Sequence, residues 1–143
     1  MDQRTRPSTP LASLSKVLAK IARARTTEAA IKTLRDTARS VIGCDGIAII
    51  LKDGDLCHYV EEDAIGSLLK GQKIPSVACV SGWSMMDRAT AVIPDIGQDD
   101  RIPYELSAGT FVRAMAMAPI RMENPVGAIG AYWSQPYTPA DWE

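Results

Sequence analysis

The chain has 143 residues, of which 46% are hydrophobic and 23% are charged, and its formal net charge at pH 7 is −1. These values are typical of one soluble domain and exclude two full domains. The longest apolar runs, 47–51 and 114–120, are far shorter than the ~20 residues that a membrane-spanning helix needs. We therefore expect a cytoplasmic protein without membrane insertion.

Positive charge is concentrated at the N-terminal end. Residues 1–39 contain nine Lys or Arg and three Asp or Glu, for a net charge of +6, whereas residues 40–143 contain seven and fourteen, for −7. The basic residues are spread along two helical patterns, without aromatic residues among them on which bases could stack. Because the acidic remainder of the chain would repel phosphate, we expect no nucleic-acid partner.

Three cysteines and one histidine are the candidate soft metal ligands and strong nucleophiles. An odd number of cysteines without a CxxC spacing argues against a disulfide framework. A zinc site would need Cys44, Cys57, Cys79 and His58 together, but Cys57 and His58 are neighbours on a predicted strand and so point to opposite faces. We expect no metal.

Two amphipathic helices are predicted before the first strand. The first covers about 11–25, and its apolar residues repeat over about two coiled-coil heptads, which predicts a dimer interface. These residues are Leu11, Leu14, Leu18 and Ile21. The second helix begins near Glu28 and ends at Gly43, because glycine suits the left-handed conformation after a helix.

From Gly46 the pattern changes from helical to extended. Residues 47–52 and 56–60 predict two antiparallel strands. They are joined by Asp53-Gly54, a dipeptide typical of two-residue hairpin turns.

The middle of the chain has shorter elements. A polar helix or loop is expected over 61–71, then an extended segment at 76–80 and a short helix capped by Ser81. Residues 91–93 predict a strand, and 97–110 predict a loop rich in Gly, Asp, Pro and Ser.

Two further strands are predicted near the C-terminal end, at 114–120 and 126–133. Residues 138–143 have the pattern of a helix start, which predicts that this sequence was cut from a longer one. The order of elements predicts an α+β fold, with helices packed on an antiparallel sheet.

Five groups of short runs follow one another along the chain. They are Asp53-Gly54-Asp55 with Cys57-His58-Tyr59, Glu62-Asp63-Ala64-Ile65 with Lys70-Gly71, Cys79-Val80-Ser81-Gly82-Trp83, Ile93-Pro94-Asp95-Ile96 with Asp100-Arg101-Ile102-Pro103, and Ala118-Pro119-Ile120-Arg121 with Pro125-Val126-Gly127-Ala128-Ile129-Gly130. In this order they resemble the GAF domain, a small-molecule-binding and dimerising module of cytoplasmic signalling proteins. They are similar to GAF domains that precede the kinase core of bacterial sensor histidine kinases, and the similarity covers about residues 24–143.

The resemblance implies a sheet of five or six antiparallel strands. The N- and C-terminal helices would lie on one face, and a ligand pocket on the other face would be roofed by the segments after Val60 and Asp95. Residues 1–25 would form a basic dimerisation or linker helix, and residues 26–143 the sensory domain with a truncated last helix.

The resemblance also implies a pocket for a small molecule whose identity the sequence leaves open. The expected lining is mostly apolar and aromatic: Cys79, Trp83, Met115, Met117, Tyr132 and Trp133, with Asp95 and Arg113 to orient the ligand. The expected function is that of a homodimeric sensory domain of a two-component protein, acting on a downstream kinase module and not itself catalytic.

Two alternatives come from single residues. Cys79 precedes a helix start, where a thiol becomes more reactive, and Ala78-Cys79-Val80 is similar to part of the site of free methionine-(R)-sulfoxide reductase, a GAF-fold enzyme. That family has a further cysteine soon after, where this chain has Met85, Met86 and Asp87, and neither Cys44 nor Cys57 is an obvious resolving thiol from the sequence. Cys57-His58 is similar to the attachment dipeptide of bilin-binding GAF domains, and His58 is the one candidate haem ligand.

Overall fold

Two helices precede the sheet. The computed structural model describes residues 10–102 and 109–138, with side chains from residue 14 onward. Helix α1 spans Pro10–Arg23 and helix α2 spans Thr27–Ile42. Thr26 caps α2 by accepting a hydrogen bond from the Ala29 backbone N–H at 3.0 Å. The prediction that Gly43 ends α2 is confirmed, because Gly43 has a φ of 77° and its N–H donates to the Arg39 carbonyl.

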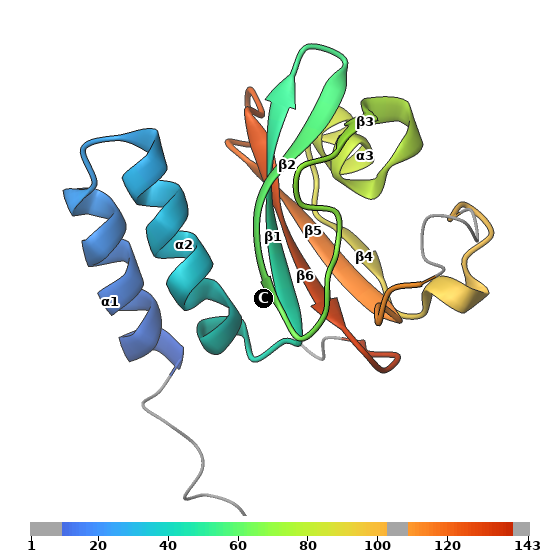
Figure 1. Cartoon of the computed structure of the whole chain (residues 1–143), viewed down its shortest axis with the longest axis horizontal. Helices are drawn as coiled ribbons and strands as arrows, with labels where there is room; N and C mark the ends of the chain where they lie inside the picture. The colour runs from blue at the N-terminus through green and yellow to red at the C-terminus, as the bar shows by residue number, and fades with distance from the viewer. Residues whose placement is uncertain (1–9, 103–108, 139–143) are drawn as a thin grey trace, which may run out of the picture.

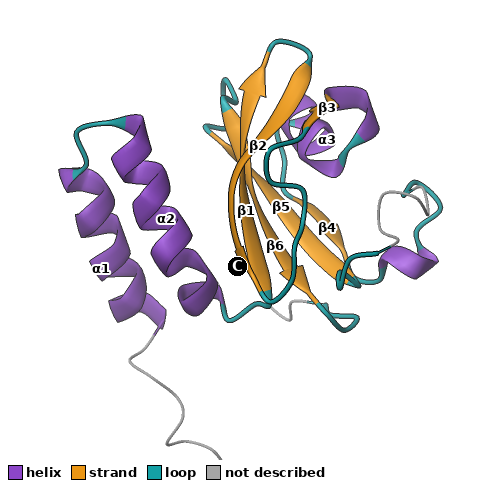
Figure 2. Cartoon of the chain, in the orientation of Figure 1, coloured by secondary structure: helices purple, strands orange, loops and turns teal. Residues whose placement is uncertain are grey.

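Six strands form one antiparallel sheet in the order β3-β2-β1-β6-β5-β4, which confirms the predicted fold class (Figures 1 and 2). The strands are β1 (Gly46–Asp53), β2 (Leu56–Ala64), β3 (Lys73–Pro75), β4 (Ala91–Ile93), β5 (Ala114–Ile120) and β6 (Gly127–Trp133). The short helices are η2 (Ser76–Ala78), α3 (Val80–Asp87) and η3 (Ile96–Gln98). None of the described helices is long and apolar enough to cross a membrane.

Strand β2 is longer than predicted. The helix or loop expected over 61–71 is a loop that begins only after Ala64, so its predicted start is wrong, because β2 continues to Ala64 and pairs with β1. A β-bulge lies in this pairing: Ile49 is opposite Glu61 and Ile50 is opposite Tyr59, so Val60 is the extra residue. A bulge reverses the alternation beyond it, so Glu61 faces the helices and Glu62 faces the other side.

The start of α3 also differs from the prediction. Residues 76–78 form the 3₁₀ turn η2 in place of an extended segment, and Cys79, not Ser81, is the residue that precedes α3. The reason lies at Gly82, where a Cβ atom would be only 1.9 Å from the Ser76 carbonyl oxygen. Without that side chain, α3 begins early and packs directly on η2. The predicted C-terminal helix falls mostly on 139–143, outside the described residues.

The sheet has two different faces. On the helix face, Ile47 and Ile49 are fully buried and pack with Ile31 and Leu34 of α2. On the opposite side, which we call the cavity face, a larger apolar cluster packs against α3 and the loops. Figure 1 shows α1 and α2 on one side of the sheet and α3 on the other. Helix α2 contacts β1 and β2, and α1 contacts α2.

Candidate ligand-binding site

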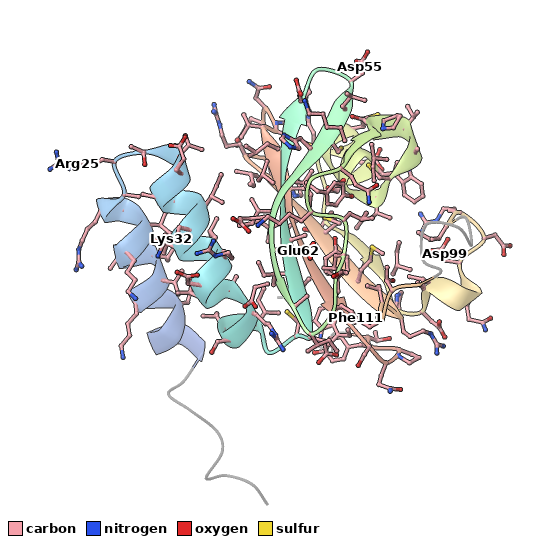
Figure 3. All side chains as sticks on the ribbon, in the orientation of Figure 1. Arg25, Lys32, Asp55, Glu62, Asp99 and Phe111 are labelled. Carbon is pink, nitrogen blue, oxygen red and sulfur yellow. The ribbon has the colours of Figure 1, made fainter. Side chains whose placement is uncertain are left out.

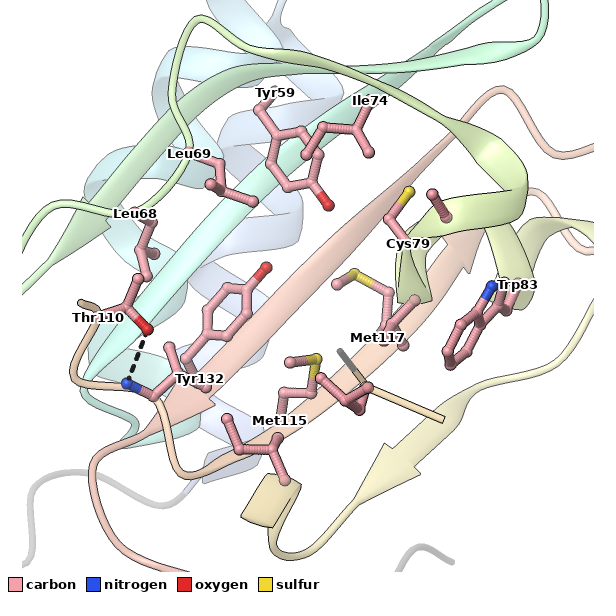
Figure 4. A pocket seen from close by; sticks show the side chains of 15 residues that line it. Tyr59, Leu68, Leu69, Ile74, Cys79, Trp83, Thr110, Met115, Met117 and Tyr132 are labelled. Atoms are coloured by element: carbon pink, nitrogen blue, oxygen red, sulfur yellow. Dashed lines mark hydrogen bonds between the residues drawn. The ribbon is translucent and has the colours of Figure 1, made fainter. Parts of the chain in front are cut away.

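A cavity lies between the sheet, on the side away from α1 and α2, and the segments that contain α3 and the loops (Figure 4). About 70 Å³ of it can hold the centre of a water molecule, and the enclosing hollow is partly open to solvent. Its lining is mainly apolar, with three hydroxyl groups and one thiol: Tyr59, Leu68, Leu69, Ile74, Ala78, Cys79, Val80, Trp83, Ile96, Ile102, Thr110, Val112, Met115, Met117 and Tyr132.

The floor of the cavity comes from β5 and β6. Met115 pairs with Tyr132, and Met117 pairs with Gly130, so these four residues share one face. A Cβ atom on Gly130 would be 2.6 Å from the Tyr132 hydroxyl oxygen. The missing side chain therefore makes room for the Tyr132 ring to lie back over its own strand.

Glu62 holds part of the roof in place. Its two carboxylate oxygens accept backbone hydrogen bonds from Leu68 and Lys70, each at 3.0 Å. Leu68 and Leu69 belong to this segment and line the cavity. The segment is also tied to β2, because the Tyr59 N–H donates to the Gln72 carbonyl at 2.9 Å. The position of this wall thus depends on a charged side chain turned inward by the β2 bulge.

Three polar side chains form a hydrogen-bonded row along one wall of the cavity. The hydroxyls of Tyr59 and Ser81 are 3.0 Å apart, and the Ser81 hydroxyl is 3.2 Å from the Cys79 sulfur. Ser81 is fully buried. Across the cavity, the Tyr132 hydroxyl has no hydrogen-bond partner among the described residues, and burial raises its pKa, so it remains protonated. It is free to donate a hydrogen bond to an occupant.

The Cys79 thiol is the acidic group of this wall. Its pKa is lowered, most strongly by the neighbouring Cys57 thiol and further by the Ser81 hydroxyl and the Gly82 backbone amide. Burial acts in the opposite direction but is the smaller influence. The pKa of Cys57 is raised by Cys79 and by burial. Cys79 is therefore the thiol that carries the charge, and Cys57 keeps its proton.

The rim of the cavity is held by two ion pairs. Asp99 accepts two hydrogen bonds from the Arg101 guanidinium, at 2.9 and 2.6 Å, and this guanidinium lies 5.7 Å from the centre of the Trp83 ring. Asp95 pairs with Arg113 at 3.3 Å and also accepts the Gly97 N–H. Asp99 lies on a loop remote from α1 and α2 (Figure 3).

Five of the eight expected pocket residues line the cavity together: Cys79, Trp83, Met115, Met117 and Tyr132. Asp95 and Arg113 are not in the lining and bind each other at the rim. Trp133 is also outside it, because side chains alternate along β6 and the one after Tyr132 turns to the helix face. There it stacks on Tyr137 with ring centres 4.5 Å apart.

The sequence did not predict the other ten lining residues, among them Tyr59, Leu68 and Leu69, nor the role of Glu62 in holding the roof. The alternation of Cys57 and Tyr59 along β2 could have indicated that Tyr59 shares the buried face of Cys57. Nothing in the sequence marks the bulge that turns Glu62 inward.

The expected dimer residues lie on α1. Leu14 is 43% exposed and Leu18 is 56% exposed, while Ile21 is half-buried. The neighbouring Val17 is buried. The Leu11 side chain is outside the described part of the structure. Helix α1 therefore buries one apolar edge and leaves Leu14 and Leu18 uncovered in the single chain.

Cys57 and His58 point to opposite faces of β2. Cys57 is fully buried in the apolar cluster of the cavity face, while His58 is half-buried and lies opposite Leu51. Cys44 is buried in the helix-face cluster, away from the other two cysteines. Within 10–102 and 109–138, no group of three or more His, Cys, Asp or Glu side chains could hold a metal ion.

Known proteins with this architecture were found by family and structure comparison. The family model for the GAF domain matches residues 26–143, and no curated protein matches the chain.

Similar solved structures include three of different kinds. The GAF domain of a phosphoenolpyruvate-protein phosphotransferase from Coxiella burnetii has a TM-score of 0.78 and 13% identity, covering 92% of this chain and 82% of that one. Free methionine-R-sulfoxide reductase from Neisseria meningitidis has a TM-score of 0.75 and 15% identity, covering 88% of this chain and 74% of that one. The phycocyanobilin-bound GAF domain of a cyanobacterial phytochrome has a TM-score of 0.73 and 17% identity, covering 93% of this chain and 84% of that one. With the family match over most of its length, the chain belongs to the GAF domain family, whose members are small-molecule-binding regulatory domains.

Proposed function

We propose that this domain is a sensor for a small, uncharged and mostly apolar molecule that carries at least one hydrogen-bonding group. The observation that carries the proposal is the composition of the lining. Among the described residues that line the cavity there is no Lys, Arg, His, Asp or Glu. An anionic ligand would find no positive charge there and would be repelled by the Cys79 thiolate, and a cationic ligand would have to give up its hydration for a single negative charge on one wall. The free Tyr132 hydroxyl supports a polar group on the ligand.

The volume of the cavity limits the size of the ligand. An engineered apolar cavity of about 150 Å³ in another protein binds benzene, and this cavity has about 70 Å³ open to water centres. A single ring or a short chain is therefore the largest ligand that can enter, and a ring enters only as the roof adjusts. The Leu68–Leu69 segment is the part of the roof best able to adjust, because few groups besides Glu62 and β2 hold it.

The test uses three probes of similar shape and different charge: phenol, benzoate and benzylammonium. Phenol should raise the melting temperature and shift the amide resonances of cavity residues, since a ligand at a hundredfold its Kd stabilises by about 2.7 kcal/mol. The two charged probes should do neither. Equal effects of all three probes, or none from phenol, would contradict the proposal.

Matched variants locate the binding. Val112→Phe fills the cavity and should abolish the response to phenol, whereas Val77→Phe makes the same change at a residue that is 75% exposed and should leave the response intact. Tyr132→Phe should weaken phenol binding roughly tenfold, the effect of one lost hydrogen bond, without weakening toluene.

We further propose that two copies of the domain form a homodimer through their α1 helices. Ligand binding would change the arrangement of these helices, and the change would be transmitted to a downstream kinase. Support comes from the uncovered Leu14 and Leu18 on a helix that otherwise packs on α2. The coupling free energy between ligand binding and a rearrangement of subunits is typically about 1–3 kcal/mol. Leu14→Glu with Leu18→Glu should give a monomer by light scattering, while Ala19→Glu on the other side of α1 should not.

The proposed kinase context is that of a cytoplasmic two-component protein, in which this domain is a sensor and not the enzyme. Three free cysteines fit a reducing compartment, and the runs that resemble GAF domains of sensor kinases support the rest. An ATP-binding module and a phosphoacceptor histidine in the reading frame that contains this domain are the expected result. A reading frame that lacks both would remove the kinase from the proposal.

A second candidate function, favoured by the acidic Cys79 thiol in the cavity wall, is reduction of free methionine-(R)-sulfoxide. The test is incubation with free methionine sulfoxide and dithiothreitol. Turnover that Cys79→Ser abolishes would support the enzyme, and no turnover would leave the sensor as the function.

A further inference from the structure

Two cysteine thiols are neighbours at the wall of the cavity. Cys79 is 5% exposed and lines the cavity, whereas Cys57 is fully buried and is not in the lining. Both lie beside the same turn: the Cys57 sulfur is 3.7 Å from the Ser76 hydroxyl, and the Cys79 sulfur is 3.6 Å from the carbonyl oxygen of Pro75. A reagent in the cavity therefore meets Cys79 first and finds Cys57 behind it.

The surroundings make the two thiols unequal. Cys57 and the Ser81 hydroxyl favour the thiolate of Cys79, which lies at the start of α3. The interaction with Cys79, and after it burial, hold the proton on Cys57. An anionic nucleophile and a protonated partner at one wall are the two groups that stepwise dithiol oxidation requires.

We propose that Cys57 and Cys79 form an oxidation site at which a hydroperoxide that enters the cavity is reduced and the two sulfurs join as a disulfide. In the first step the Cys79 thiolate attacks the terminal peroxide oxygen. An S–O bond forms, the O–O bond breaks, and the alkoxide leaves and takes up from solvent a proton, equivalent to the one that the Cys79 thiol released, to become an alcohol. Cys79 is now a sulfenic acid, oxidised by two electrons.

In the second step the Cys57 sulfur attacks the Cys79 sulfur. The S–S bond forms, the S–O bond breaks, and the hydroxide leaves with the Cys57 proton as water. Two thiols and one hydroperoxide thus give one disulfide, one alcohol and one water. This chemistry is independent of any effector that the cavity binds, and its oxidant is a hydroperoxide, not methionine sulfoxide.

The disulfide would join β2 to the start of α3. A disulfide needs its sulfurs about 2.05 Å apart, so the N-terminal turn of α3 would be drawn toward β2. Ala78, Val80 and Trp83 lie on this segment and line the cavity. Oxidation would therefore change the shape of the cavity as well as the charge of its wall.

Cys44 provides an internal control. It is buried in the helix-face cluster, its sulfur is 3.2 Å from the Gly46 carbonyl oxygen, and burial raises its pKa. At neutral pH, Cys79 should be oxidised at least about tenfold faster than Cys44, since each unit of pKa changes the thiolate fraction about tenfold.

The experiment treats the whole reduced domain with hydrogen peroxide or cumene hydroperoxide and maps the cysteines by mass spectrometry. The expected result is a loss of two hydrogens, one Cys57–Cys79 linkage, free Cys44 and full recovery with dithiothreitol. The oxidation rate should rise with pH and level off below the ordinary thiol pKa of 9.0. Oxidation of Cys44 at the rate of Cys79, or linkage between chains in its place, would overturn the proposal.

Variants separate the two steps. Cys57→Ser should stop at the Cys79 sulfenic acid, trapped with dimedone, and Cys79→Ser should leave Cys57 reduced. Cys44→Ser should react like the wild type. Should Cys57→Ser prove unfolded by circular dichroism, Cys57→Ala gives the same test without a buried hydroxyl. Disulfide mapping of the wild type tests the proposal whether or not these variants fold. A wild-type protein that keeps three free thiols after peroxide treatment would refute it.

Discussion

The two faces of the central sheet use the same strands for different purposes. Along β1, Ile47 and Ile49 turn toward α2, while Ala48 and Ile50 turn toward the cavity. The helix face is packed by large aliphatic side chains and bordered by ion pairs from α2 to β2, such as Arg35 with Glu61 at 3.2 Å. The cavity face holds a hollow, a chain of hydroxyl and thiol groups, and a roof of loops.

The difference shows how one alternating pattern serves both stability and binding. A filled face gains free energy from each buried methylene, whereas a face with a hollow gives up part of that gain. The cavity face compensates with specific contacts: the polar anchors Glu62 under the roof and Asp99 with Arg101 at the rim, and the close packing of α3 on η2 at Gly82. We therefore expect the cavity face to depend on a few anchors and the helix face on bulk packing.

The largest expected effect is at Gly82. In Gly82→Ala the new Cβ would be 1.9 Å from the Ser76 carbonyl oxygen, a backbone atom that cannot move alone. The free energy of unfolding should fall by about 3 kcal/mol or more, measured by urea denaturation.

Gly66→Ala is the control for this change, because its nearest neighbour is a Phe111 ring atom at 3.4 Å. That variant should stay within about 1 kcal/mol of the wild type. Similar losses at both glycines would mean that close packing at η2 is not special to the cavity face.

The second prediction compares bulk packing on the two faces. Ile49→Ala removes a fully buried side chain from the helix face and should cost about 3–4 kcal/mol. Leu69→Ala removes a half-buried side chain beside a hollow and should cost about 1–2 kcal/mol. Urea denaturation of both variants measures the difference, and equal costs would contradict the division of roles between the faces.

Much of the fold could be predicted because its signals are local. Asp53-Gly54 encodes its own turn, with Gly54 at a φ of 60°, and Gly43 ends α2 for the same stereochemical reason. Alternation along β5 places Met115 and Met117 on one face without any knowledge of the partner strand. Each of these features depends on a few consecutive residues.

The site could be predicted only in part because its remaining features depend on contacts between distant segments. Cys57 and Cys79 meet because β3 and η2 return the chain to β2, and a spacing of twenty-two residues does not reveal that. The outward positions of Asp95 and Arg113 follow from their pairing with each other at the rim. Glu62 turns inward because of a single bulge at Val60, which no residue preference marks.

The third prediction concerns the roof. Glu62→Gln keeps one acceptor oxygen but presents an N–H group to a second backbone N–H, so one of the two hydrogen bonds is lost. Stability should fall by about 1–2 kcal/mol, and the amides of Leu68 and Lys70 should exchange with solvent faster. Asp63→Asn on the helix side of β2 should change stability by less than about 1 kcal/mol. Unchanged exchange at Leu68 would show that the roof is held without Glu62.

The smallest expected effect is a pH dependence at the rim. The hydrogen bonds from the Arg101 guanidinium lower the pKa of Asp99 to about 2, below its ordinary 3.8. Because the folded state has the lower pKa, Asp99 stabilises the fold above about pH 4, and this contribution is lost as the pH falls toward 2. Arg101 is 64% exposed, so solvent screening limits the effect to roughly 1 kcal/mol or less.

A double-mutant cycle isolates this contribution from the other carboxylates. Asp99→Asn should reduce the free energy of urea unfolding at pH 7, and the difference from the wild type should vanish near pH 2. In an Arg101→Gln background the same substitution should have little effect at either pH, because the group that lowers the Asp99 pKa is gone. A pH-dependent loss that persists without Arg101 would mean that the rim is held by another contact, and that the cavity face relies on fewer charged anchors than the structure indicates.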